Sequence, residues 1–173
     1  MFKAITLGAA LTAGAGYAEI QNVYLEAVDG TRIQIAEIDL AEDGRYSVTM
    51  AEAPFTDHFL SMRPFRCLEG PAKHWCHVPY PYDITRQIGD DLTDLEYDFL
   101  FLWKGSTEYG INMWNGVYYV LEENNGRLTG TLHEMDMDIL SAPPDHGELR
   151  PVQAKHLEPG EPESHWLPVL VIE

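Results

Sequence analysis

The sequence predicts an all-β protein: a single antiparallel β-barrel or sandwich of about eight or nine short strands, with at most one short helix. Two observations predict this class. Apolar and polar residues alternate with period two in several segments, which is the pattern of half-buried strands. Turn-forming residues separate these segments at short intervals, as in sandwiches and barrels. The length of 173 residues fits one domain of this kind.

Composition and charge narrow the class of protein. The chain is 45% hydrophobic and 23% charged, which is ordinary for a globular protein. Its 11 Lys and Arg residues stand against 28 Asp and Glu residues, a net charge of −17. Because such a charge repels phosphate backbones, we expect no nucleic-acid partner. No apolar run reaches the roughly 18 residues of a transmembrane helix, so we expect no transmembrane segment.

The first 18 residues have the three parts of a secretory signal peptide. Lys3 precedes an apolar stretch at 4–16, and Gly16 and Ala18 are the small residues before a cleavage site. We therefore expect a cleaved leader at 1–18 and a single β domain at 19–173. Loss of Lys3 leaves that domain with a net charge of −18. The expected location is outside the cytoplasm, periplasmic in a bacterium and secreted otherwise.

The exported context predicts the state of the two cysteines. Cys67 and Cys76 are nine residues apart, and an even pair in an oxidising compartment is typical of a disulfide. Closing this loop would stabilise the fold by about 2–3 kcal/mol. A thiolate metal ligand or a nucleophile is the alternative, and no C-x-x-C motif supports a redox centre.

Strand patterns and turn signals follow one another in the first half of the chain. Asp29-Gly30 and Glu42-Asp43-Gly44 supply the first two turns. The last two strands of this half can be tied by the disulfide. The expected strands are residues 23–28, 32–38, 46–50, 58–66 and 74–78.

The second half begins with a short helix expected around residues 91–95. The apolar and aromatic segment 97–103 predicts a central strand buried on both faces, with a helix as the weaker alternative. Asn125-Gly126 predicts a tight hairpin between strands 117–122 and 127–132, in which Gly130 suits a curved wall. We expect a surface loop at 143–162 and a last strand at 165–172.

The segment 58–86 is the one stretch where positive charge exceeds negative. Its cations are Arg63, Arg66, Lys73 and Arg86, against Glu69 and Asp83. We expect Arg63 and Arg66, near His74 and His77, to form an anion-recognising patch at one barrel end. Residues three apart on a strand face opposite sides, so the arginines converge only through an irregularity at Pro64. Pairing with acidic neighbours is the alternative.

Three sets of residues have metal-ligand chemistry. His58, His74 and His77 carry imidazoles, although a regular strand separates 74 from 77. The set His133, Met135 and Met137 suits Cu(I), and the set Glu134, Asp136 and Asp138 suits Ca²⁺. Regular alternation would bury those three acids. We therefore favour a β-bulge near His133 that turns the methionines into the core and the acids outward.

The sequence leads to two classes of function. Trp114 and Asn115, with other loop aromatics and amides, suit a surface for a sugar or an apolar ligand, or they cap the barrel end. We favour a non-enzymatic exported β-barrel module that binds a small anionic or apolar ligand or an envelope partner. The alternative is a metal-binding carrier or a hydrolase that uses segment 58–86, although no enzyme motif is present. Ligand-binding candidates are Arg63, Arg66, His74, His77, Trp114 and Asn115, and no residue is assigned to catalysis or to a cofactor.

Overall fold

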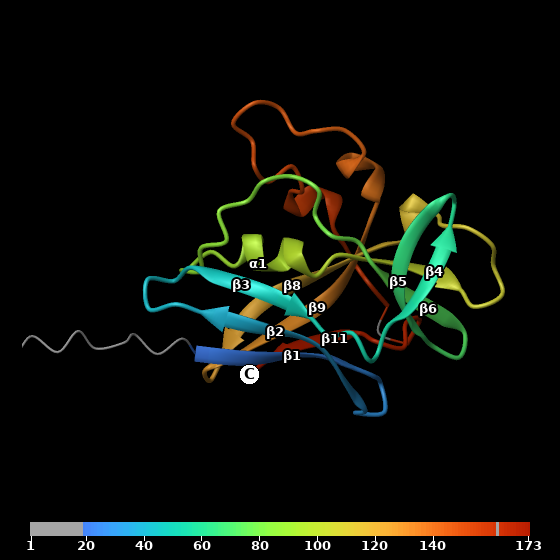
Figure 1. The fold of residues 1–173 in the computed structure, drawn as a ribbon, viewed down its shortest axis with the longest axis horizontal. Coiled ribbons are helices and arrows are strands. Elements are labelled where there is room, and N and C mark those ends of the chain that lie inside the picture. The colour runs from blue at the N-terminus through green and yellow to red at the C-terminus, as the bar shows by residue number, and fades with distance from the viewer. Residues whose placement is uncertain (1–18, 162) are drawn as a thin grey trace, which may run out of the picture.

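A computed structural model describes residues 19–161 and 163–173, so the expected leader lies outside the described residues. The described chain is nearly all β, as predicted: eleven strands form one antiparallel sheet, accompanied by one short α-helix (Figure 1). The strands are β1 (Glu19–Glu26), β2 (Arg32–Leu40), β3 (Tyr46–Met50), β4 (Thr56–Leu60), β5 (Arg63–Glu69), β6 (Lys73–His77), β7 (Phe101–Gly105), β8 (Gly116–Asn124), β9 (Arg127–Met135), β10 (Glu158–Pro159) and β11 (Val169–Ile172).

The sheet is an open path with the order β3-β2-β1-β11-β9-β8-β7-β6-β5-β4, and β10 pairs with β9 off this path. Along this path the fewest residues pair between β7 and β8, where the pairs are Phe101 with Val117 and Leu102 with Gly116. Figure 1 shows β4, β5 and β6 as a ribbon on one side of the larger part of the sheet. The sheet therefore consists of two groups of strands, β4–β6 and the remaining strands, and β7 connects them by pairing with β6 and with β8.

Glycine and asparagine turns behave as the sequence predicts. Gly30 and Gly44 have φ angles of 83° and 82°, a region that favours glycine. In the β8–β9 hairpin, Asn125 and Gly126 have φ angles of 55° and 77°, and Asn124 pairs with Arg127. Both central residues thus have the positive φ of a type I′ turn, which fixes the register of this hairpin.

The segment 58–66, predicted as one strand, is instead a hairpin. It contains the end of β4, a turn at Ser61 and Met62, and the start of β5. Both turn residues have positive φ, 47° and 63°, although neither is Gly, Asn or Asp. The turn therefore lacks the residues by which such turns are recognised. This hairpin, together with the two-residue β10 inside the expected loop 143–162, raises the strand number from nine to eleven.

The segment 97–103, predicted as one buried strand, contains the end of a helix and the start of a strand. Helix α1 (Thr93–Asp98) covers Tyr97, and β7 starts at Phe101. Phe99 and Leu100, between them, are fully buried in two different cores. A continuous apolar run predicts a strand, but here a short, largely buried helix is followed directly by a strand, and periodicity alone does not distinguish the two.

Strands β8 and β9 separate two hydrophobic cores. Tyr119 on β8 packs into the core that also holds Leu95 of α1, whereas its neighbour Tyr118 packs into the second core. The bulge expected near His133 does not form, because β8 and β9 pair in continuous register from Asn124 to Gly116. Met135 is buried because the second face of β9 is covered as well. These two strands therefore contribute buried side chains from both of their faces, whereas the hairpin end around Asn124 and Arg127 is exposed.

The disulfide between Cys67 and Cys76 is confirmed. The two residues are directly paired on β5 and β6 with their Cα atoms 4.0 Å apart, so the bond joins neighbouring strands. No helix of the described residues is long and apolar enough to cross a membrane.

Candidate functional site

The two arginines of the predicted anion patch do not converge. Strands β4 and β5 pair without interruption from Leu60 with Arg63 to Thr56 with Cys67, so Pro64 introduces no irregularity. Residues 63 and 66 therefore face opposite sides of the sheet. The Arg66 guanidinium donates to the carbonyl of Glu52 at 3.1 Å and lies 5.3 Å from the Phe55 ring centroid. Arg63 lines a separate cavity of about 520 Å³.

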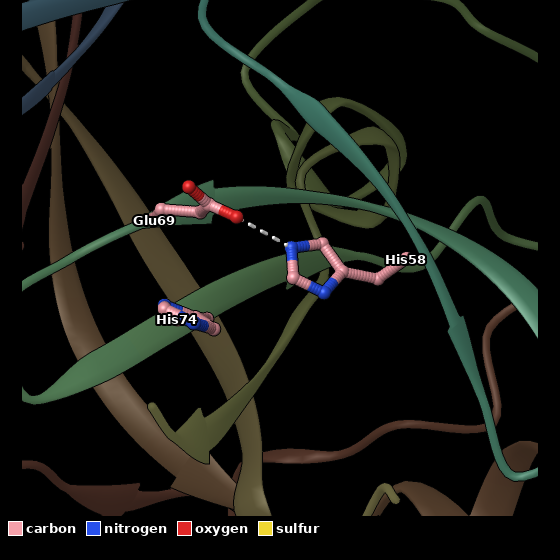
Figure 2. Close-up of side chains that lie close together, drawn as sticks. All are labelled: His58, Glu69 and His74. Atoms are coloured by element: carbon pink, nitrogen blue, oxygen red, sulfur yellow. Dashed lines mark hydrogen bonds and ion pairs between the residues drawn. The ribbon is translucent and has the colours of Figure 1, made fainter. Parts of the chain in front are cut away.

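The histidines of the same segment are divided between the two faces of β6. Nε2 of His77 lies 3.0 Å from the carbonyl oxygen of Asp98, and burial lowers the His77 pKa. His74 faces the other way and lies beside His58, with the ring centroids 5.4 Å apart (Figure 2). The structure thus brings His58 and His74 together and separates both from His77.

Trp114 and Asn115 lie in the short 3-10 helix η1 (Met113–Asn115) before β8. The Trp114 side chain is exposed, while the Asn115 amide donates to the Trp103 carbonyl at 3.1 Å. Asn115 therefore holds β7 to η1, and its amide is occupied by this contact.

A mostly apolar cavity lies elsewhere in the described part of the chain, at one end of the sheet. It has a volume of about 690 Å³, within the range of about 300–1,000 Å³ that is usual for ligand sites. Its walls come from the β1–β2 turn, the β5–β6 turn and the segment before β11. The lining residues are Ala27, Val28, Asp29, Thr31, Ile33, Pro71, Ala72, Lys73, Glu163, Ser164, His165 and Trp166.

At the β5–β6 turn, the cavity wall depends on a close approach between the backbone of Gly70 and the indole ring of Trp166. A Cβ atom placed on Gly70 would lie 2.5 Å from the Trp166 ring and would also meet the carbonyl of Lys73. Only glycine leaves room for both. The absence of a side chain at residue 70 therefore lets the Trp166 segment close on the turn that presents Lys73.

Three ionisable side chains form a hydrogen-bonded chain at the cavity wall. Glu134 Oε1 lies 2.7 Å from His165 Nε2, and His165 Nδ1 lies 3.2 Å from Lys73 Nζ. Because a carboxylate accepts, Nε2 carries the proton and Nδ1 accepts from the lysine. Lys73 also donates to the Ser164 carbonyl at 2.7 Å, and its Nζ lies 4.1 Å from the Trp103 ring centroid.

Burial lowers the pKa values of two side chains in this hydrogen-bonded chain. Desolvation is the main reason that the pKa values of Lys73 and His165 are both lowered, while the Glu134 carboxylate opposes the change. The imidazole of His165 lies against the rings of Trp75 and Trp103, at centroid distances of 5.3 and 5.6 Å. His165 is therefore a neutral hydrogen-bond relay between Glu134 and Lys73 at neutral pH.

Sequence reasoning missed this arrangement. By sequence, Lys73 is one cation of a positive segment and Glu134 is one acid of a possible Ca²⁺ site. The two lie on β6 and on β9, and His165 comes just before β11, so no spacing motif links them. The pairing of β9 with β11, which aligns Thr131 with Val169, brings Glu134 and His165 together.

The chain matches no family model, no curated protein and no solved structure.

Proposed function

We propose that this protein is an exported, non-enzymatic binding module that holds one small molecule in the cavity beside Lys73. The observation that carries the proposal is the combination of an apolar wall with one cationic donor. Val28, Ile33 and Trp166 offer a hydrophobic surface, and Lys73 supplies the charge. Ligand sites in proteins have this composition: mostly apolar, with a few placed polar groups.

The ligand class follows from the donors of Lys73. Two protons of its ammonium group are engaged by Ser164 and His165, which leaves one for an acceptor in the cavity. Asp29 and Glu163 also line the cavity, and they disfavour a ligand of high negative charge. We infer a molecule with an apolar body and a single anionic group, such as a carboxylate or a sulfonate, of which one oxygen accepts from Lys73.

Export is part of the proposal, and two observations support it. The leader pattern at residues 1–18 is that of a secreted protein. The disulfide between Cys67 and Cys76 belongs to an oxidising compartment.

Two fluorescent probes with one apolar body test the site. Anilinonaphthalene sulfonate carries an anionic group, and N-phenylnaphthylamine is the same ring system without it. We expect both to bind in a one-to-one complex. Lys73→Met should weaken sulfonate binding about tenfold or more, because a charged hydrogen bond contributes roughly 1.5–3 kcal/mol. Binding of the neutral probe should stay nearly unchanged.

A matched pair of variants places the probes in the cavity. Val28 and Ile20 are exposed apolar residues, at 65% and 63%, but only Val28 lines the cavity. Val28→Asp should weaken binding of both probes, whereas Ile20→Asp should weaken neither. Equal losses in the two aspartate variants, or a Lys73→Met variant that binds the sulfonate like the native protein, would refute the proposed site.

A further inference from the structure

A second cluster of side chains lies on the opposite face of β6. His58 on β4, Glu69 on β5 and His74 on β6 come from three neighbouring strands, and Figure 2 shows them pointing toward one another. The register explains this placement. Glu69 pairs with His74, and His58 pairs with Phe65, which has the same parity as Glu69 on β5. The three side chains therefore share one face of the sheet.

The distances within the cluster are short. His58 Nε2 lies 2.9 Å from Glu69 Oε1, and the three residues each offer a ligand atom within 4.8 Å of the other two. In a tetrahedral site with metal–ligand bonds of about 2.1 Å, ligand atoms are about 3.4 Å apart. No two ligand atoms of the cluster therefore have to approach each other by more than about 1.4 Å, and the half-exposed side chain of Glu69 is free to move toward the two rings.

One atom of the cluster is unexplained by the protein alone. His74 Nδ1 is buried and has no hydrogen-bond partner. Buried polar nitrogens are normally paired, because leaving one unpaired costs free energy. His74 thus brings to the cluster an imidazole with a buried nitrogen that the protein leaves unpaired, and this residue offers a ligand atom within 4.8 Å of those of His58 and Glu69.

We propose that His58, Glu69 and His74 bind one divalent transition-metal ion of the Zn²⁺ type. Two imidazoles and one carboxylate are a ligand set that Zn²⁺ takes, with a fourth position left for water or a ligand. Hard ions such as Mg²⁺ and Ca²⁺ prefer sites made wholly of oxygen and bind here weakly. The Glu69 side chain is half-exposed, so the ion can reach the site from solvent.

The neighbouring residues affect this site in two opposite ways. Cys67 and Cys76 form the next cross-strand pair on the same face, so the disulfide holds the strands of Glu69 and His74 together. Lys104 pairs with His74 across β6 and β7 and is almost fully buried. Desolvation, and then the Lys104 charge, lower the pKa of His74, which keeps its imidazole neutral at pH 7. The same charge repels the ion and limits its affinity.

The test is titration of the full mature protein, freed of any purification tag, with Zn²⁺ by calorimetry and with Co²⁺ by visible absorption. We expect one Zn²⁺ per chain, competition between the two metals, and no heat with Mg²⁺. His58→Gln and Glu69→Gln should each weaken binding about 10-fold to 100-fold, because each removes a direct ligand. Both positions are partly exposed, so these variants retain the fold.

The control is His146→Ala, which removes an exposed imidazole from the loop 143–162. It should bind Zn²⁺ like the native protein. The proposal is overturned if no metal binds, or if His58→Gln and Glu69→Gln bind as tightly as the native protein. Lys73→Met separates this inference from the proposed cavity, since it should change binding of the sulfonate probe and leave Zn²⁺ affinity unaltered.

Discussion

The two faces of β6 carry clusters of similar ionisable residues that differ in how completely their polar atoms are hydrogen-bonded. Lys73, His165 and Glu134 on one side form a continuous chain of hydrogen bonds around a buried imidazole. On the other side, His74 has a buried nitrogen without a partner. Each member of the Lys73 chain already has a partner, and only the remaining ammonium proton of Lys73 is left for a ligand, whereas the unpaired nitrogen of His74 has no partner until a ligand binds.

The clusters also differ in how the chain assembles them. His58, Glu69 and His74 lie within 17 residues on consecutive hairpins. Lys73 and His165 are 92 positions apart, and they meet only after β11 has paired with β9. The first cluster therefore depends on local hairpin register and the disulfide, and the second on completion of the sheet.

Removal of Trp75 should destabilise the strand that carries residues of both clusters. This fully buried side chain follows Lys73 and His74 on β6, donates to the Tyr119 hydroxyl at 3.0 Å and packs against the His165 ring. Trp75→Ala should lower the free energy of unfolding by about 3–5 kcal/mol, measured by urea denaturation. A loss below about 1 kcal/mol would mean that the two clusters do not share this support.

Removal of the disulfide should affect the two clusters unequally. The double variant Cys67→Ala, Cys76→Ala should lose about 2–3 kcal/mol of stability, because the nine-residue separation closes a short loop. Zn²⁺ binding should weaken, since Glu69 and His74 are on the two strands that the bond joins. Binding of N-phenylnaphthylamine by the folded variant should persist. Equal losses at both sites would contradict the local character of the histidine cluster.

Acidification should lower the free energy of unfolding, and protonation of the buried His165 should contribute more to this loss than protonation of an exposed histidine. Burial lowers the pKa of His165 below its ordinary value of 6.5, so the unfolded chain takes up a proton more readily than the folded one. The contribution of His165 to the free energy of unfolding is therefore full above pH 6.5, and it is lost as the pH falls through the pKa of His165 in the folded protein. Urea midpoints measured from about pH 7 to about pH 5 should therefore decrease.

His165→Gln should flatten this pH dependence, because glutamine does not titrate there. The exposed His146→Ala variant serves as the comparison and should retain the native slope. A slope that is equal in both variants would assign the pH effect to other buried histidines, among them His77, whose pKa is lowered by burial as well.

The smallest expected effect concerns Lys104. Lys104→Met keeps the length of the buried side chain and removes the charge beside His74. Zn²⁺ should then bind a few-fold more tightly in calorimetric titration, because repulsion of the dication is gone. Unchanged or weaker binding would show that the Lys104 charge does not reach the metal site.

Local chemistry made most of the fold predictable. Period-two alternation identified the strands, and Asn125-Gly126 identified the register of the β8–β9 hairpin, because positive φ is available to these residues at low cost. The turn at Ser61 and Met62 was not predictable, since neither residue favours that conformation by itself. Pairing along β4 and β5 imposes it.

The disulfide and the excess of acids were determined by the sequence alone, because cysteine number, spacing and charge need no coordinates. The sequence also presented the histidines of segment 58–86, but strand register decided that His58 joins His74 and that His77 and Arg66 lie on the other face. Arg63 shares the face of Glu69 but lies at the far end of β5. Only tertiary structure joined Glu134, His165 and Lys73. Their contacts join two strands and the segment before β11 over up to 92 positions, and such proximity arises from the order of strands in the sheet, which no local pattern encodes.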